Sequence, residues 1–209
     1  MDSIIFDLDG TLWDSRENVA KVWNQVLKQY SDARGTITKD DLKKTMGLQI
    51  QDIAKVLFDY LDEERQLALI QECSQVENKY LLENGGTLYP RLEEVLQELS
   101  QKYPLFIVSN CQEGYIESFF AYHRLEKYFV DFENPGRTGL TKGQNIELIM
   151  ERNHLSSPIY VGDTQGDRDA AAYAGIPFVY AAYGFGTVEQ YDARVERFED
   201  LLQLHGLFR

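Results

Sequence analysis

The sequence predicts an α/β fold with a mainly parallel sheet and an all-helical insertion after the first strand. Three short apolar runs, at 4–6, 105–108 and 159–161, indicate strands that are buried on both faces, as in a parallel sheet. Apolar residues at helical spacing lie between the later runs. Alternation of strands and helices along a chain is typical of a parallel sheet covered by helices.

A long helical stretch follows the first strand and does not fit this alternation. Its apolar residues recur in helical stripes, and Thr38 with Asp41 resembles a capping box that opens a short helix. We therefore predict an inserted helical cap at 15–84, with residues 1–14 and 85–209 forming the core. The segments expected to join the two parts, and to act as hinges, are Asp14–Ser15 and Gly85–Gly86.

The rest of the chain returns to strand and helix alternation. Pro90 opens the first helix of this part, because proline is tolerated in a first helical turn. The further predicted elements are a strand at 105–108, helices near 114–121 and 143–153, a strand at 159–161, a helix at 167–174, a strand at 178–180 and a closing helix that contains Phe198, Leu201, Leu202 and Leu204.

The end of the first strand carries two carboxylates, Asp7 and Asp9. Alternation along a strand sends residues i and i+2 to the same side, and Gly10 then lets the backbone turn sharply. Two like charges held this close repel each other unless a proton or a metal ion intervenes. A single Asp after a strand can be a solvated turn, whereas this pair indicates a functional site.

Polar residues also follow the second and third apolar runs. Ser109 and Asn110 come after the run at 105–108 and can hydrogen-bond an oxyanion. Asp163 follows the run at 159–161, with Asp167 one helical turn further on. Open α/β sheets bind ligands beyond the carboxyl ends of their strands, so we expect these side chains to meet in one crevice.

The order and type of these motifs resemble those of the haloacid dehalogenase-like hydrolase superfamily. The stretch Asp7–Leu12 is similar to its first signature, Ser109–Asn110 to its second motif, and Gly162–Asp167 to its fourth. Lys142 stands where the lysine of the third motif is expected, although Gly143 follows it where phosphatases of this group usually have proline. The resemblance implies a Rossmann-like core with a C1-type helical cap, as in phosphoglycolate phosphatase-like members.

The resemblance also implies a phosphatase that hydrolyses a small phosphomonoester through an aspartyl-phosphate intermediate. Asp7 would be the nucleophile, and Asp9 would protonate the leaving group and then activate the attacking water. Lys142 would place a compact cation on the transferring group, while Ser109 and Asn110 would donate hydrogen bonds to its oxygens.

Mg²⁺ is the cofactor that the resemblance implies, and this ion prefers oxygen ligands. Its expected ligands are the Asp7 carboxylate, the Asp9 backbone carbonyl and the Asp163 carboxylate. Asp167 is expected either to bind the metal or to orient its ligands as an outer-shell group.

A break in the helical pattern at Met46–Gln49 marks the part of the cap that we expect to face the crevice. Gly47 would permit a turn there, and Gln49 is the predicted substrate contact. Trp23 and Met46 can equally be core residues of the helical bundle, since both fit its helical spacing. Selectivity should reside in this cap, and the sequence does not identify the substrate.

Other reactions of the superfamily fit this sequence less well. Dehalogenases lack the second aspartate of the first motif, so Asp9 disfavours them. Sugar-phosphate mutases have a cap histidine shortly after that motif, and the stretch Arg16–Ala20 contains none. Phosphonoacetaldehyde hydrolases need a cap lysine, and neither Lys21 nor Lys28 has the expected context. A mutase of the same superfamily and a non-catalytic binding protein on this scaffold stay as alternatives.

Composition narrows the choice of partners and compartment. With 21 Lys and Arg against 34 Asp and Glu, the formal net charge of −13 argues against nucleic-acid binding. No apolar run approaches the length of a membrane span, and the start lacks the basic region of a signal peptide. Cys73 and Cys111 form neither a disulfide framework nor a zinc site. We expect a cytoplasmic enzyme that acts on a small phosphorylated molecule, in an oligomeric state that the sequence leaves open.

Overall fold

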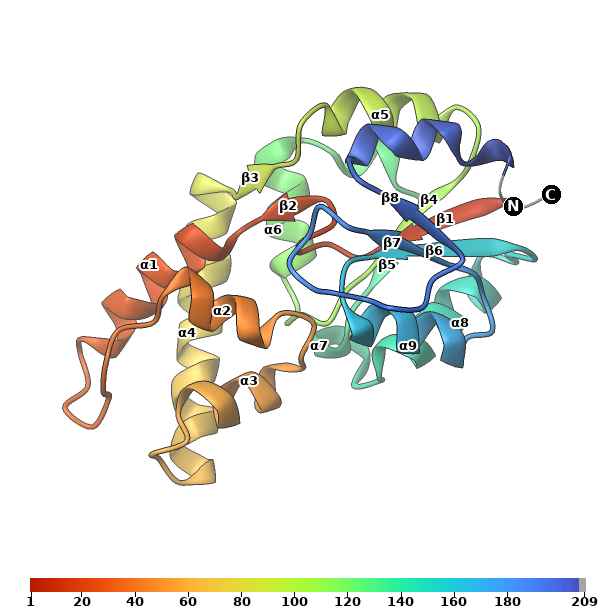
Figure 1. Cartoon of the computed structure of the whole chain (residues 1–209). Coiled ribbons are helices and arrows are strands. Elements are labelled where there is room, and N and C mark those ends of the chain that lie inside the picture. Colours follow the sequence, from red (N-terminus) through yellow and green to blue (C-terminus); the bar gives the residue numbers. More distant parts are fainter. Residues whose placement is uncertain (207–209) are drawn as a thin grey trace.

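A six-stranded, wholly parallel sheet forms the centre of the computed structural model, which describes residues 1–206 (Figure 1). The four inner strands consist almost entirely of buried residues, as their continuous apolar runs predict. The predicted α/β class is therefore confirmed. In spatial order the strands are β5 (Asp131–Glu133), β4 (Leu105–Val108), β1 (Ser3–Phe6), β6 (Pro158–Gly162), β7 (Phe178–Ala181) and β8 (Ala193–Val195).

Helices cover both faces of the sheet because alternate residues of each strand point to opposite sides. Ile5 and Tyr160 pack in the apolar cluster of one face, which includes Ile146. Ile4 and Phe6 pack in the cluster of the other face. The helices of the first face are α8 (Lys142–Arg152) and α9 (Gln165–Tyr173), and those of the second include α5 (Leu92–Ser100), α6 (Tyr115–His123) and the 3-10 helix η2 (Phe198–Gly206).

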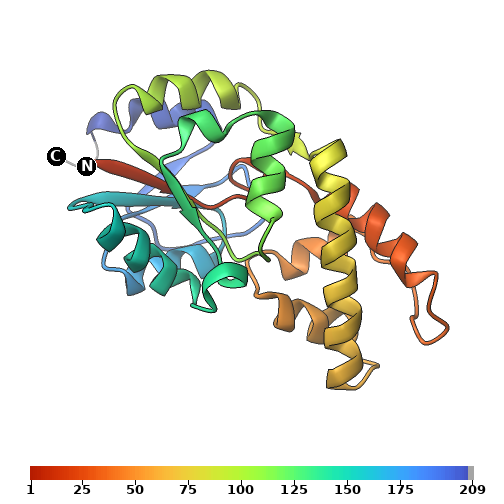
Figure 2. The same ribbon diagram turned by 180° about the vertical axis from the view of Figure 1, so that it is seen from behind.

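The helical segment after the first strand is also confirmed. It lies beside the carboxyl ends of the strands, and its longest helix runs along α6 of the core (Figure 2). The predicted capping box of Thr38 and Asp41 is present, with each residue accepting a backbone hydrogen bond from the other. The helices of this segment are α1 (Arg16–Leu27), α2 (Lys39–Thr45), α3 (Ile50–Leu57) and α4 (Glu63–Asn84).

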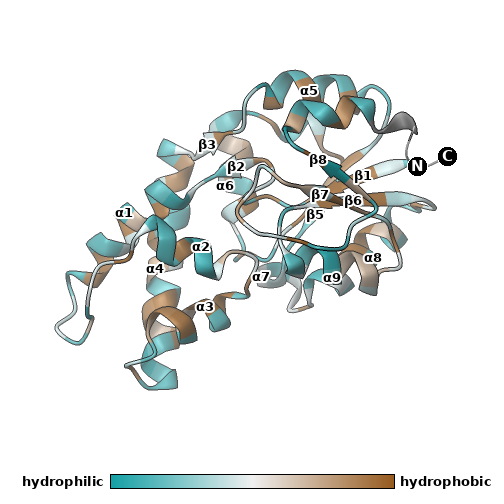
Figure 3. Cartoon of the chain, viewed as in Figure 1, coloured by the Kyte–Doolittle hydropathy of each residue, from teal (hydrophilic) through white to brown (hydrophobic). Residues whose placement is uncertain are grey.

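One apolar cluster runs without interruption from the sheet into the helical segment. It includes Phe6 of β1, Phe119 of α6, and Trp23 and Leu81 of the inserted helices. Hydrophobic colour gathers on the inner strands and alternates with hydrophilic colour along the helices (Figure 3). The division into a core and a cap with boundaries at 14/15 and 84/85 stays a prediction.

The two connections to the helical segment pair with each other, which the sequence does not indicate. Strand β2 (Trp13–Asp14) leads into the segment and strand β3 (Thr87–Leu88) leads out of it. They form an antiparallel ladder in which Trp13 faces Leu88 and Asp14 faces Thr87. The ring of Trp13 is fully buried and packs edge-on against Phe119 at a centroid distance of 5.1 Å.

Short elements account for the remaining differences from the predicted order. Strands β5 and β8 have three residues each and lie at the two edges of the sheet, and the closing helix is a 3-10 helix. The side chain of Leu204 lies outside the described residues.

None of the helices in the described chain is both long and apolar enough to cross a membrane. The two short helices not yet named are η1 (Glu126–Tyr128) and α7 (Pro135–Thr138).

Candidate active site

The carboxyl ends of β1, β4 and β6 bring the predicted polar residues to one end of the sheet. Asp7 follows β1, and its backbone N–H donates to the Val161 carbonyl at 2.8 Å, which continues the pairing with β6. Ser109 follows β4, and Asp163 follows β6. All three side chains are at least 96 % buried, so they face the interior of the site and not bulk water.

Lys142 connects two of the carboxylates. Its Nζ atom donates to Asp7 Oδ1 at 2.9 Å and to Asp167 Oδ1 at 2.5 Å. The lysine is the first residue of α8, where Thr141 and Gln144 form a capping box that fixes the start of the helix. Although Gly143 replaces the expected proline, Lys142 reaches Asp7 and Asp167 from the first residue of α8.

Burial and neighbouring charges act in opposite directions on these groups. Burial and the Asp167 charge raise the pKa of Asp7 to about 6, although Lys142 opposes the shift. Burial alone would lower the pKa of Lys142, but the charges of Asp167 and Asp7 outweigh it and hold this pKa well above its usual value. The lysine is therefore a permanent cation at this end of the sheet.

Asp167 uses both of its carboxylate oxygens within the protein. Oδ1 accepts from Lys142, while Oδ2 accepts from the backbone N–H groups of Asp163 and Thr164, at 3.1 and 2.9 Å, and from the Thr164 hydroxyl at 2.7 Å. The threonine hydroxyl in turn accepts from the Asp167 N–H, completing a capping box at the start of α9. Asp167 thus orients Lys142 and begins a helix at the same time.

Asp163 is fully buried, and only one of its two carboxylate oxygens has a hydrogen-bond partner among the described residues. Its Oδ2 atom accepts from the Phe185 N–H at 2.6 Å, whereas its Oδ1 atom has no hydrogen-bond partner among the described residues. Gly10 has a φ of +83°, and a Cβ at this position would collide with the Asp163 carboxylate. The glycine after the first aspartate pair is therefore required both for the turn and for the approach of Asp163.

The three buried carboxylates form a group that fits a metal ion. One oxygen each from Asp7, Asp163 and Asp167 lies within 4.8 Å of the others. The unpartnered Asp163 Oδ1 supplies a free acceptor in this group, and oxygen donors suit a hard divalent cation. Burial, followed by the charges of Asp167 and Asp7, raises the pKa of Asp163 well above its usual value, and a cation bound here would counter that effect.

Asp9 stands slightly apart from this group and is held by hydroxyls. Its Oδ1 atom accepts from Ser15 Oγ at 2.7 Å and from Tyr115 Oη at 3.0 Å, and the two hydroxyls lie 2.8 Å from each other. Burial, reinforced by the Asp7 charge, raises the pKa of Asp9 to about 7 despite the opposing Ser15 hydrogen bond. A carboxyl with such a pKa can exchange a proton near neutral pH.

Sequence reasoning placed Ser15 only in a hinge segment and gave Tyr115 no role, so it assigned neither hydroxyl to the site. Ser15 lies three residues after the first motif, which is a local signal that was available. Tyr115 comes from α6, one hundred residues later, and only the packing of that helix places it at the site.

The loop at Met46–Gln49 lies on the core side of the helical segment, as predicted. The Gly47 carbonyl accepts from Asn110 Nδ2 at 2.8 Å, which joins the loop directly to a predicted phosphate-binding residue. Gly47 has a φ of +81°, and a Cβ there would stand 3.0 Å from the Thr164 hydroxyl. The loop therefore needs glycine to reach the core.

A cavity of about 560 Å³, open solvent included, extends from the carboxylates into the helical segment. Ser109 and Asn110 line it, and so do Trp23 and Met46, which are therefore cavity residues as well as members of the bundle. Gln49 does not line it, because the wall passes from Leu48 to Ile50. Its role as a substrate contact stays a prediction. The lining also includes Asp7, Asp9, Ser15, Val19, Leu42, Thr45, Gly47, Ile53, Glu77, Cys111, Gln112, Tyr115 and Lys142.

Residues 4–181 match the family model described as haloacid dehalogenase-like hydrolase. The phosphoglycolate phosphatase of Rhodobacter capsulatus is 30 % identical over 191 residues, which covers 88 % of this chain and 85 % of the relative. The phosphoglycolate phosphatase of Photobacterium profundum is 29 % identical over 192 residues, covering 87 % and 83 % of the two chains.

Solved structures share the fold over nearly the whole chain. A crystal structure described as a predicted phosphoglycolate phosphatase from Haemophilus somnus has a TM-score of 0.85 at 22 % identity and covers 98 % of this chain and 97 % of its own. A β-phosphoglucomutase from Clostridium difficile has a TM-score of 0.73 at 16 % identity, covering 96 % and 93 %. At these identities the likeness concerns the fold alone.

Proposed function

Since this chain belongs to the haloacid dehalogenase-like hydrolase family, we propose that it is a Mg²⁺-dependent phosphatase of small phosphomonoesters. The observation that supports this most directly is that Asp7 meets both Lys142 and Asp163, and that Asp7, Asp9 and Lys142 line one cavity. This arrangement supplies a nucleophile, a cation, a metal ligand and a proton donor within one site.

In the proposed reaction, a carboxylate oxygen of Asp7 attacks phosphorus and the bond to the alcohol oxygen breaks. Asp9 gives its proton to that oxygen, so the alcohol leaves neutral and an acyl phosphate remains on Asp7. Asp9, now ionised, takes a proton from a water molecule that attacks the same phosphorus. Inorganic phosphate is released and both carboxylates return to their starting states. The raised pKa of Asp9, about 7, suits a group that must give and then regain a proton.

The charge on the transferring group would be met by donors that line the same cavity as Asp7. Lys142 supplies a fixed cation, and the buried Ser109 hydroxyl and the Asn110 amide lie in the same wall. Asp167 would position the lysine. Mg²⁺ would be held by the Asp7 and Asp163 carboxylates with the Asp9 backbone carbonyl, and it would neutralise the charge of the substrate phosphate.

A mutase reaction of the same superfamily is the second candidate, and a feature of the cavity disfavours it. A mutase must retain its intermediate and pass the phosphoryl group back to a sugar, with a cap histidine as the implied acid–base group. None of the described residues that line the cavity is a histidine. Hydrolysis by water therefore agrees better with the groups present.

The test is hydrolysis of p-nitrophenyl phosphate by the purified chain with Mg²⁺, compared with the same protein after EDTA treatment. We expect phosphate release that needs Mg²⁺ and that disappears in Asp7→Asn, because a neutral amide is a poor nucleophile and a poor ligand. Turnover by Asp7→Asn at the wild-type rate, in a preparation free of other phosphatases, would contradict the assignment of the nucleophile.

A further inference from the structure

Glu77 is a buried carboxylate in the cavity wall, away from the catalytic motifs. It comes from the inner side of α4 and is only 4 % exposed. Its Oε2 atom accepts from the indole N–H of Trp23 at 2.6 Å. Both residues line the cavity in which Asp7 and Asp9 lie, so Glu77 faces the space left for the leaving group of a substrate.

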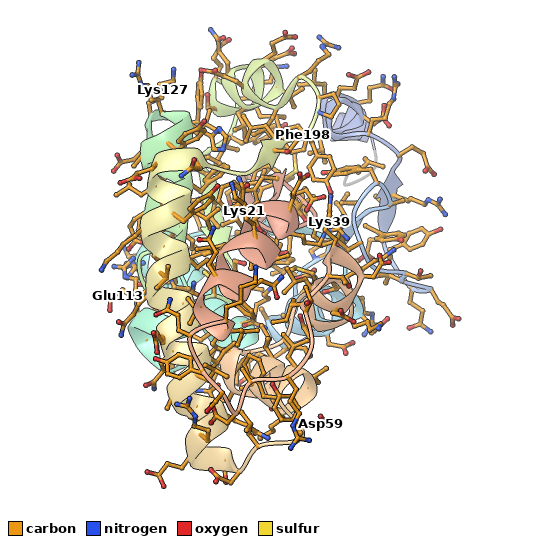
Figure 4. The ribbon with its side chains drawn as sticks, turned by 90° about the vertical axis from the view of Figure 1, so that its left-hand side faces the viewer. Lys21, Lys39, Asp59, Glu113, Lys127 and Phe198 are labelled. Atoms are coloured by element: carbon orange, nitrogen blue, oxygen red, sulfur yellow. The ribbon has the colours of Figure 1, made fainter. Side chains whose placement is uncertain are left out.

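No cation of the described chain pairs with Glu77. Lys142 is the one positively charged residue among the described residues that line the cavity, and it is held by Asp7 and Asp167. Figure 4 looks onto the outer side of the helical segment, where Lys21 and Lys39 lie. Both are exposed, and Lys39 pairs with Asp14. Buried carboxylates in proteins are normally paired, so Glu77 lacks a partner that a ligand can supply.

The hydrogen bonds around Glu77 make it an acceptor toward the protein. The Trp23 indole can only donate, and the Gln112 amide also favours the ionised form of the carboxylate. Burial outweighs both contacts and, together with the charge of Asp9, raises the pKa of Glu77 to about 8. A positive group beside Glu77 would counter this effect, whereas a second negative group would add to it.

Six apolar side chains also line the cavity, together with polar side chains such as Thr45, Gln112 and Tyr115. The Trp23 ring offers a surface on which an ammonium group is attracted by the ring quadrupole. The apolar side chains supply no positive charge that could pair with a carboxylate or phosphate on the leaving group. These residues are Val19, Leu42, Met46, Leu48, Ile50 and Ile53.

On the basis of the proposed phosphatase activity, we propose that Glu77 and Trp23 form a subsite for a cationic amine on the leaving alcohol. The preferred substrates are then phosphomonoesters of amino alcohols. Phosphomonoesters whose leaving group has a second negative charge, phosphoglycolate among them, are disfavoured because that charge would add to the cost of burying Glu77, and no free cation among the described cavity residues would offset it.

Three two-carbon phosphomonoesters test this subsite, because they differ only at the group that would reach Glu77. They are 2-aminoethyl phosphate, 2-hydroxyethyl phosphate and phosphoglycolate, which end in an ammonium, a hydroxyl and a carboxylate. We expect kcat/KM of the wild-type chain to fall in that order, with a difference of about 10- to 100-fold between the first and the last, the effect of a hydrogen bond to a charged group.

Glu77→Gln keeps the size and hydrogen bonding of the side chain and removes its charge. We expect kcat/KM to fall for 2-aminoethyl phosphate and to rise for phosphoglycolate, so that the two come within about threefold. Glu83→Gln is the matched control, since Glu83 is an exposed glutamate on the same helix. This control should keep the wild-type order.

The outcomes separate the subsite from the reaction. If the wild-type chain hydrolyses no phosphomonoester, p-nitrophenyl phosphate included, both the proposed function and the subsite are wrong. If it hydrolyses p-nitrophenyl phosphate through Asp7 but treats phosphoglycolate or 2-hydroxyethyl phosphate as well as the amine, the subsite alone is wrong. An unchanged order in folded Glu77→Gln overturns the role of Glu77. If that variant does not fold, the ranking of the three substrates by the wild-type chain alone decides whether the subsite exists.

Discussion

Lys142 Nζ lies closer to Asp167 than to Asp7, at 2.5 and 2.9 Å from their Oδ1 atoms. Because Asp167 is fully buried and anchored by two backbone N–H groups and a hydroxyl, it is a rigid support for the lysine. The position of the cation over the nucleophile is therefore set from the start of α9. This relationship leads to the first of four predictions.

Asp167→Asn should reduce kcat through displacement of Lys142, and it should affect metal binding less. We expect a loss of about 10- to 100-fold in kcat, as for removal of an outer-shell group that orients a residue of the site. The apparent Mg²⁺ constant, measured by titrating activity, should change by less than about threefold. A Mg²⁺ constant that rises as much as it does in Asp163→Asn would instead make Asp167 a direct ligand.

Asp9→Asn and Asp163→Asn should fail in different ways. The first variant keeps the backbone carbonyl but loses the proton donor, so its rate should fall by about 10²–10⁴-fold with metal affinity retained. The second should weaken metal binding, because it alters a carboxylate whose Oδ1 has no hydrogen-bond partner among the described residues. Calorimetric titration with Mg²⁺ checks both variants, and equal losses of affinity would contradict this division of roles.

Tyr115→Phe should shift the pH profile and not only the rate. The Tyr115 hydroxyl donates to Asp9 and lowers the pKa of that carboxyl, so its removal raises the pKa further above about 7. Asp9 must be protonated for the first step, and the basic limb of kcat/KM should therefore move to higher pH. Tyr122→Phe, an exposed tyrosine of the same helix, is the control. A profile that stays in place would leave Tyr115 a packing residue.

Glu77→Gln should also change how stability depends on pH. The pKa of Glu77 is about 8 in the folded chain against an ordinary value of 4.5, so the folded state binds the proton more tightly. The contribution of protonated Glu77 to the free energy of unfolding is therefore complete below about pH 4.5 and is lost as pH rises toward 8. Relative to wild type, Glu77→Gln should be more stable at pH 8.5 than at pH 5 in urea unfolding. If Glu77→Gln and wild type differ in unfolding free energy by the same amount at pH 5 and at pH 8.5, burial does not penalise the charge of Glu77.

The sequence predicted those parts of the molecule whose signal is local. The apolar run at 105–108 became β4 with the same limits, because a strand buried on both faces leaves no polar residue within it. The capping box of Thr38 and Asp41 was readable because both of its hydrogen bonds lie within four residues. Asp7 and Asp163 could be placed together because parallel strands end on the same side.

What the sequence did not reveal depends on partners far along the chain. Glu77 sits in a helix rich in charged residues and resembles a surface glutamate until α1 brings Trp23 against it, 54 residues away. The pairing of β2 with β3 uses two residues from each strand, which is too short for any periodic pattern. Strands β5 and β8 lie at the sheet edges and lack a continuous apolar run. The roles of the individual site residues stay predictions, which the variants above test.

The ladder between β2 and β3 has a consequence for how such a chain can evolve. Because the polypeptide leaves and re-enters the core through two adjacent strands, everything between Asp14 and Thr87 can lengthen, shorten or be exchanged by recombination without changing the order of the sheet. Such exchange would replace Trp23, Gly47 and Glu77 together, while Asp7, Lys142 and Asp163 remained. A lineage could in this way acquire a new leaving-group preference in a single genetic event and keep an inherited reaction.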